Sequence, residues 1–208
     1  MSFNENGYTV IKEAIPKELA TFVYNYFLVK RQVAKTMFAE KYIAPFETIF
    51  GLPEGDDQVP GAYAHYGDIA MDTLLLRVQP IMEEKTNLKL IPTYSYARIY
   101  EKGCELERHK DRFSCEISTT MNLGGDEWPI YIEPSGKENM SGNKVILKPG
   151  DMLVYKGSLL EHWREPFTGE ECCQVFLHYN NAATPGSDKN IFDNRKHVGL
   201  PSYFRVEK

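Results

Sequence analysis

The sequence predicts a mainly β protein, a sandwich or jelly roll preceded by α-helices. Two observations lead to this fold class. Before about residue 93, apolar residues recur at helical spacing. From Tyr94 onward, short β-rich segments follow one another, separated by turn signals such as Gly124-Gly125-Asp126 and Pro149-Gly150-Asp151. Many short strands at this spacing are typical of a sandwich or jelly roll.

The chain of 208 residues has the length of a single domain. Its 42% hydrophobic and 25% charged residues are ordinary for a soluble globular protein. We expect residues 1–93 to form a mostly helical support region with a loop, and residues 94–180 to form the β core. Residues 181–208 are expected to form a C-terminal tail, either docked or loosely ordered.

The overall charge argues against nucleic acid as a partner. A formal net charge of -5 does not supply the basic surface that a nucleic-acid backbone needs. No apolar run approaches the ~20 residues of a membrane span, and residues 1–8 lack the layout of a signal peptide. We therefore expect a cytoplasmic protein that has no membrane or nucleic-acid partner. The sequence carries no signal of oligomeric state.

The N-terminal region predicts one strand and then one helix. Residues 8–15 are rich in β-forming residues and predict an opening strand. Pro16 can occupy the first turn of a helix, where its missing N–H costs nothing. We expect that helix to end near residue 39. Its apolar stripe consists of Leu19, Phe22, Tyr26, Phe27 and Val33.

Residues 51–68 are rich in glycine, proline and aspartate and predict a long loop, whose role as a lid is left open. Asp68 can cap a second helix over residues 69–85. The strands of the β core are expected at residues 94–101, 114–123, 129–133, 143–148, 152–155, 160–165 and 172–179.

His109, Asp111 and His162 form the most informative pattern in the chain. Residues two apart on an extended segment face the same side, so His109 and Asp111 can reach one metal ion. His162 lies on a late strand, and early and late strands of a jelly roll can lie side by side. Two imidazoles and a carboxylate suit iron(II) and leave positions open for catalysis, whereas structural zinc sites are closed. The alternative is two ordinary histidines and a turn aspartate.

The segments around these residues resemble a known family. The first segment has Tyr100, then a turn at Gly103, then His109-Lys110-Asp111; the second runs from Pro149-Gly150-Asp151 through an apolar strand to His162. Both are similar to the iron(II)- and 2-oxoglutarate-dependent oxygenases, most nearly the prolyl-4-hydroxylase-like branch. The resemblance covers about residues 94–180.

The resemblance implies a double-stranded β-helix (jelly roll) core buttressed by two or more α-helices. It implies iron(II) held by the catalytic residues His109, Asp111 and His162, with 2-oxoglutarate and dioxygen as co-substrates. The implied reaction couples oxidative decarboxylation of 2-oxoglutarate to hydroxylation of a small molecule, peptide or protein. Peptidyl proline is the substrate suggested by analogy with the nearest branch.

One departure from the family concerns the co-substrate. The family usually has an arginine or lysine nine to twelve residues after the distal histidine, but residues 171–174 are Glu-Cys-Cys-Gln here. An arginine is well suited to pair with a carboxylate. Arg164 is the first candidate for this pairing, Arg98 the second and Arg112 the third. For each of them the alternative is an ordinary ion pair. Tyr100 can add a hydroxyl group.

Two other functions remain open. The missing basic residue favours a cupin-like metalloenzyme that does not use 2-oxoglutarate. A jelly roll can also be a non-enzymatic binding module. Among the remaining histidines, His178 either points into the pocket or is a buried histidine of the core, which is the simpler interpretation.

Overall fold

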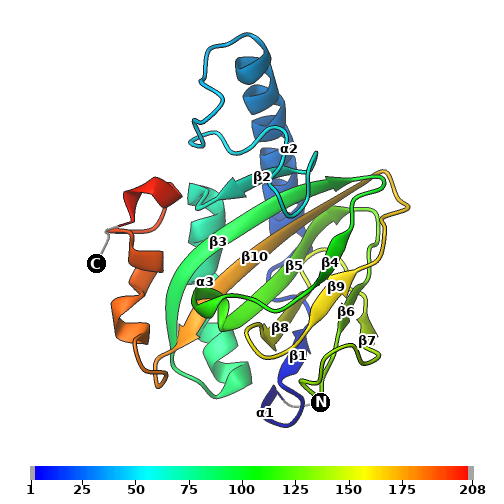
Figure 1. Cartoon of the computed structure of the whole chain (residues 1–208), viewed down its shortest axis with the longest axis vertical. Coiled ribbons are helices and arrows are strands. Elements are labelled where there is room, and N and C mark those ends of the chain that lie inside the picture. The colour runs from blue at the N-terminus through cyan, green and yellow to red at the C-terminus, as the bar shows by residue number, and fades with distance from the viewer. Residues whose placement is uncertain (1–2, 206–208) are drawn as a thin grey trace.

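The computed structural model describes residues 3–205, and within them the strands form two facing antiparallel sheets (Figure 1). The six-stranded sheet has the order β1-β8-β5-β10-β3-β2, and the four-stranded sheet has the order β4-β9-β6-β7. The strands are β1 (Tyr8–Ile11), β2 (Tyr63–Tyr66), β3 (Leu90–Glu101), β4 (Leu106–His109), β5 (Ile117–Gly125), β6 (Ile130–Ile132), β7 (Asn143–Val145), β8 (Met152–Lys156), β9 (His162–Arg164) and β10 (Glu171–Asn181).

The chain crosses repeatedly between the two sheets. From β3 to β6 each successive strand lies in the other sheet, and the same alternation resumes from β7 to β10. This crossing pattern makes the core a jelly roll, which confirms the predicted fold class. It also brings strands that are distant in sequence into contact, because β4 pairs with β9 across more than fifty residues.

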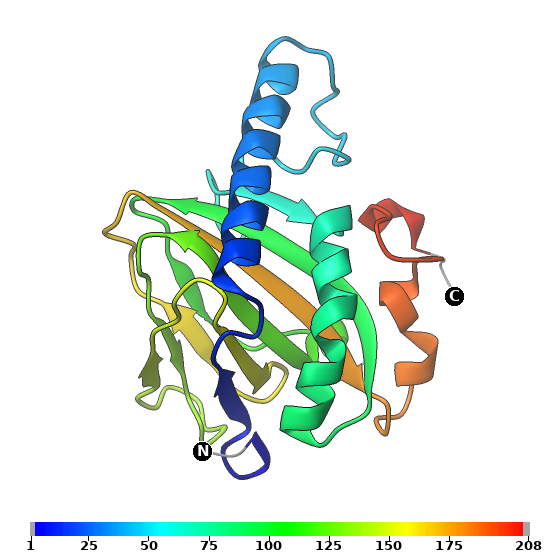
Figure 2. The ribbon, with the colours of Figure 1, turned by 180° about the vertical axis from the view of Figure 1, so that it is seen from behind.

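Helices α2 (Lys17–Ala39) and α3 (Ile69–Thr86) cover the outer face of the six-stranded sheet (Figure 2). The short helix α1 (Phe3–Asn6) precedes β1. The main hydrophobic core lies between these helices and the sheet, and its buried members include Phe27, Leu75, Ile99, Val154 and Leu177. The other face of the sheet is therefore free to form the interior of the jelly roll.

The predicted helix after Pro16 is confirmed, but its predicted apolar stripe is partly wrong. Phe22 is 70% exposed and Val33 is 43% exposed. The buried positions of α2 are instead Ala20, Val23, Phe27 and Ala34. The small side chains of Ala20 and Ala34 allow the helix to approach the sheet closely. The C-terminal end of α2 extends beyond the sheet (Figure 1). The large apolar residues of α2 were therefore a poor guide to its buried face.

The second helix begins as predicted. The Asp68 side chain accepts hydrogen bonds from the backbone N–H groups of Ala70 and Met71. These groups have no partner inside the helix, so the cap stabilises its first turn. The preceding loop differs from the prediction, because Tyr63–Tyr66 forms β2 at the edge of the sheet beside β3.

Several strand boundaries also differ from the prediction. The opening strand ends at Ile11 rather than residue 15, and Glu13 adopts a left-handed backbone conformation. Strand β3 begins at Leu90, four residues early. Residues Phe113–Cys115 form a 3-10 turn. Strand β4 was not predicted separately, since its four residues are mostly polar and charged.

The C-terminal region is docked as far as residue 205. It forms three short 3-10 helices at Ser187–Lys189, Ile191–Asn194 and Ser202–Phe204. Arg195 makes a fully buried ion pair with Asp72 of α3, in which Nη1 and Oδ2 lie 3.1 Å apart. No helix in the described part of the chain combines the length and apolar character needed to cross a membrane.

We predict that Asp72→Ala lowers the free energy of unfolding by about 3–5 kcal/mol, because it leaves Arg195 buried without its partner. Asp72 also accepts hydrogen bonds from the backbone N–H groups of Ser95 and Gly199. Urea denaturation measures the change. The exposed Asp57→Ala is a matched control and should change stability by less than about 0.5 kcal/mol. Equal effects of the two substitutions would contradict the assigned role of Asp72.

Candidate metal and co-substrate site

The pairing of β4 with β9 places His109 directly opposite His162. Asp111 follows two residues after His109. Its Oδ1 lies 3.7 Å from His109 Nε2 and 3.6 Å from His162 Nε2. One ligand atom from each of the three residues lies within 4.8 Å of the other two. The structure therefore brings together the three residues that the sequence singled out as metal ligands.

The hydrogen bonds of the two imidazoles determine which nitrogen atom is free. His109 Nδ1 lies 2.7 Å from the Glu107 carbonyl oxygen, and His162 Nδ1 lies 3.0 Å from the Leu160 carbonyl oxygen. A carbonyl oxygen only accepts, so each Nδ1 carries the proton and donates it. Each Nε2 then presents a lone pair toward Asp111, as a metal ligand must.

The pKa shifts of His109 and Asp111 also favour protonation states that can bind a metal ion. Burial lowers the pKa of His109, and the neighbouring His162 lowers it further. Burial opposes ionisation of Asp111, but the nearby imidazoles of His162 and His178 and the hydrogen bond donated by Ser118 hold the pKa of Asp111 well below its usual range. At neutral pH the site therefore offers a neutral His109 imidazole and an ionised carboxylate, the protonation states that bind a cation.

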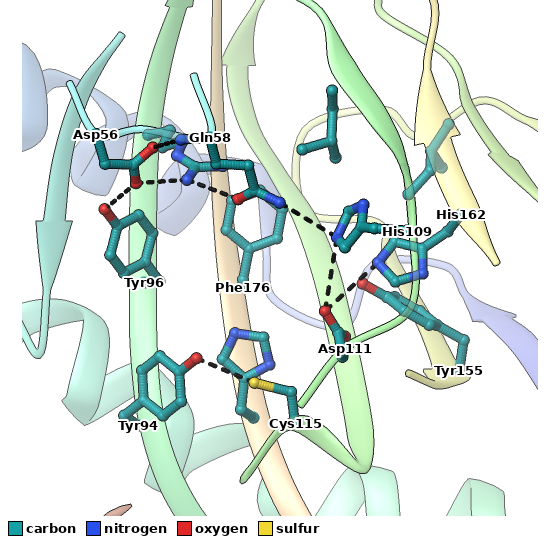
Figure 3. Close-up of a pocket in the computed structure, with 14 residues that line it drawn as sticks. Asp56, Gln58, Tyr94, Tyr96, His109, Asp111, Cys115, Tyr155, His162 and Phe176 are labelled. Carbon is teal, nitrogen blue, oxygen red and sulfur yellow. Dashed lines mark hydrogen bonds and ion pairs between the residues drawn. The ribbon is translucent and has the colours of Figure 1, made fainter. Parts of the chain in front are cut away.

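A cavity of about 210 Å³ opens beside these three residues (Figure 3). The metal-ligating candidates lie on one side, and the rings of Tyr94, Tyr96 and Phe176 lie on the other. The side chains that line the cavity are Asp56, Gln58, Tyr94, Tyr96, Arg98, Leu106, His109, Asp111, Cys115, Ile130, Tyr155, His162, Phe176 and His178. The site thus has room for a ligand next to the open side of the triad.

Part of the predicted loop forms the rim of this cavity. Asp56 Oδ1 accepts hydrogen bonds from the backbone N–H groups of Gln58 and Val59, while Oδ2 accepts from Tyr96 and Arg98. Gln58 Oε1 accepts from Arg98 Nη2 at 2.8 Å, which directs Gln58 Nε2 toward His109 Nε2 at 3.4 Å. The loop is therefore held against the site by the Asp56–Arg98 ion pair.

The three candidate arginines have different surroundings. Arg98 lines the cavity and is paired with Asp56. Arg164 is 1% exposed and donates to the Trp128 carbonyl and to the Thr120 hydroxyl. Arg112 is paired with Asp193 of the docked tail. The ion-pair alternative therefore describes Arg112 and Arg98, whereas Arg164 has no carboxylate partner among the described residues.

Tyr100 lies near both buried arginines. Burial raises the pKa of Tyr100, whereas the charge of Arg98, a poorly aligned hydrogen bond with Arg98 and the charge of Arg164 lower it. The Tyr100 hydroxyl and the Nε atoms of both arginines are buried without a well-formed hydrogen bond to any described residue. Unsatisfied buried polar groups are uncommon in proteins, so these atoms can take a polar ligand or a water molecule as partner. Of the three residues, Arg98 lines the cavity.

Sequence reasoning missed several residues of the cavity. Tyr94 and Tyr96 lie on the same face of β3 as Arg98, which the sequence had already singled out, because the three residues are two positions apart. That spacing could have predicted that both tyrosines line the cavity. Asp56 and Gln58 come from a loop whose position no pattern indicates. The buried-core interpretation of His178 is incomplete, since this residue is buried but also lines the cavity.

No protein-family model matches the chain, and no curated protein sequence matches it. Similar structures are known. A prolyl-4-hydroxylase from Pseudomonas putida is 14% identical, with 87% of this chain and 96% of that chain covered and a TM-score of 0.57. HygX from Streptomyces hygroscopicus, solved with nickel and 2-oxoglutarate, is 14% identical, with 87% and 85% covered and a TM-score of 0.56.

A prolyl hydroxylase from Trichoplax adhaerens, solved with a peptide fragment of the hypoxia inducible factor oxygen degradation domain, is also similar. It is 14% identical, with 86% of both chains covered and a TM-score of 0.58. At these identities the comparisons establish a shared fold. The chain thus has the fold of solved prolyl hydroxylases and other 2-oxoglutarate enzymes, as the resemblance implied.

We predict a pH-dependent stability that depends on His178. Burial lowers the pKa of His178 to about 4, against about 6.5 in an unfolded chain. The unfolded state therefore takes up a proton first as the pH falls. Stability is fully present above pH 6.5 and is lost toward pH 4, by up to roughly 3 kcal/mol from this group.

Urea denaturation of the metal-free protein at several pH values between 7 and 4 measures this loss. In His178→Asn, which cannot titrate, the loss over the same pH range should be smaller. An unchanged pH dependence in this variant would show that His178 does not contribute.

Proposed function

We propose that this protein is a non-haem iron(II) oxygenase that couples decarboxylation of 2-oxoglutarate to hydroxylation of a substrate. One observation carries the proposal: two Nε2 lone pairs and one carboxylate oxygen converge at the wall of a cavity. Two imidazoles and a carboxylate with open positions are typical of iron(II) oxygenases. The fold shared with 2-oxoglutarate enzymes supports the same conclusion.

The residues of the site have distinct proposed roles. His109, Asp111 and His162 would hold iron(II), which would supply the activation of dioxygen and the decarboxylation chemistry. The bonds from His109 and His162 to backbone carbonyls orient the rings before the metal binds. The rim residue Gln58 donates toward the same His109 nitrogen that would bind the metal, so metal binding requires the Gln58 amide to move aside.

We assign the far carboxylate of 2-oxoglutarate to Arg164, assisted by Tyr100. Arg164 is fully buried inside the jelly roll and lacks a carboxylate partner among the described residues, whereas Arg98 already has Asp56. A carboxylate placed here would satisfy both the Tyr100 hydroxyl and the Arg164 Nε. It would also compensate a buried positive charge, which is costly without a partner.

The wall of the cavity opposite the three metal-ligand candidates is suited to the substrate. Tyr94, Tyr96 and Phe176 provide an aromatic wall there. Asp56 balances the charge of Arg98 beside this wall, so the wall favours an uncharged ring or side chain. A peptidyl proline fits this description, and two of the proteins with the same fold are prolyl hydroxylases.

The first test loads the protein with iron(II) without oxygen and then admits air and 2-oxoglutarate. We expect one iron per chain and formation of succinate. Both should be lost in His109→Ala, because a ligand is removed. Iron binding without binding or turnover of 2-oxoglutarate would favour a cupin-like metalloenzyme. A protein that never binds iron would favour a binding module.

The second test locates the co-substrate anchor. We expect Arg164→Ala to raise the Kd for 2-oxoglutarate at least about a hundredfold while iron affinity stays nearly constant, because a buried ion pair loses one partner. Anaerobic titration of the iron-loaded protein measures both constants. The exposed Arg77→Ala is the control and should change neither. If Arg98→Ala has the large effect and Arg164→Ala does not, Arg98 is the anchor.

A further inference from the structure

A buried hydrogen-bond chain lies behind Asp111, on the side away from the two imidazoles. The Ser118 hydroxyl oxygen is 2.7 Å from Asp111 Oδ2 and 2.9 Å from His178 Nδ1. Ser118 is 0% exposed and His178 is 6% exposed. The two residues face each other in the register of the paired strands β5 and β10, so the sheet itself places them together.

The direction of the chain follows from proton counting. Ser118 has one hydroxyl proton, and both Asp111 Oδ2 and the Cys115 carbonyl oxygen, at 2.8 Å, can only accept it. A bond to an ionised carboxylate is the stronger of the two. With that proton directed to Asp111, the Ser118 oxygen accepts from His178 Nδ1–H. The chain therefore runs from His178 through Ser118 to Asp111.

Gly157 closes the space around the same carboxylate. A Cβ atom at Gly157 would lie 2.3 Å from Asp111 Oδ2 and 2.7 Å from the Ser118 hydroxyl oxygen. The Gly157 carbonyl also accepts a hydrogen bond of 2.9 Å from the Asp111 backbone N–H. Asp111 is thus held at its backbone and at Oδ2, and Oδ1 alone points toward His109 and His162.

This arrangement is not a nucleophilic triad. In such a triad the histidine lies between the serine and the aspartate and removes the serine proton. Here the serine lies between the other two residues, its proton is directed to the aspartate, and its side chain is fully buried. The chain can orient Asp111, but it cannot attack a substrate.

We propose that Ser118 and His178 are positioning residues that hold Asp111 as a ligand through one oxygen, Oδ1, which keeps further metal positions open for the co-substrate and dioxygen. This inference rests on the proposed metal site. Without the Ser118 hydroxyl, Oδ2 is free to turn toward the metal, and the carboxylate loses its preset orientation. Residues that support metal ligands in this way typically contribute 10- to 100-fold to metal affinity.

The test compares four variants of the full chain. Ser118→Ala removes the hydroxyl, and His178→Leu removes the donor behind it. His178→Asn keeps an N–H donor close to the position of Nδ1. Ser95→Ala is the matched control, because the Ser95 hydroxyl also donates to a buried aspartate, Asp72, but belongs to the core beside α3.

Anaerobic titration with iron(II) and the visible absorption of the cobalt(II)-loaded protein provide two readouts besides activity. We expect Ser118→Ala and His178→Leu to lower metal affinity about 10- to 100-fold and to change the cobalt spectrum, which reports coordination geometry. His178→Asn should retain affinity and spectrum close to those of the unaltered protein. Ser95→Ala should lower thermal stability without changing either readout.

Two results would overturn the inference in distinguishable ways. If the unaltered protein binds metal and Ser118→Ala has the same affinity and cobalt spectrum, the positioning role fails and the proposed function stands. If the unaltered protein binds neither iron(II) nor cobalt(II), both proposals fail. A His178→Asn variant that behaves like His178→Leu would overturn the role of the His178 donor.

Discussion

The register between β4 and β9 is the constraint on which the site depends. It places His109 opposite His162, so two imidazoles from distant parts of the chain face the same point. A shift of one residue would turn one of these side chains to the other face of the sheet. The jelly roll maintains this register because β9 also pairs with β6, which leaves it held on both sides.

Helices α2 and α3 cover only the outer face of the six-stranded sheet, so its inner face is available to form the cavity. Because α2 and α3 cover the outer face, the apolar residues of alternate positions on β3 and β10 are buried there. The remaining alternate positions carry the polar and aromatic side chains of the cavity, such as Arg98, Phe176 and His178. One sheet thus supplies the hydrophobic core on one face and the chemistry on the other.

Charge in the site is balanced locally. Asp56 neutralises Arg98 in the cavity wall, and Asp193 of the docked tail region pairs with both Arg112 and Arg205. Arg164 stands apart, because its partners among the described residues are a hydroxyl, a carbonyl and the Trp128 ring, none of which carries a negative charge. A buried positive charge is costly without an anion. The proposed co-substrate contact is therefore assigned to Arg164, two residues after His162, although the family usually has this basic residue nine to twelve residues after the distal histidine.

The sequence by itself determined the jelly-roll class, the two long helices, the Asp68 cap and the candidate metal ligands, since each depends on local spacing or residue type. Only the tertiary structure decided which face of α2 is buried, that residues 56–58 reach the site, and that Ser118 stands between His178 and Asp111. These features depend on contacts between segments far apart in the chain. Local periodicity carries no information about such contacts, so no pattern of neighbouring residues could predict them.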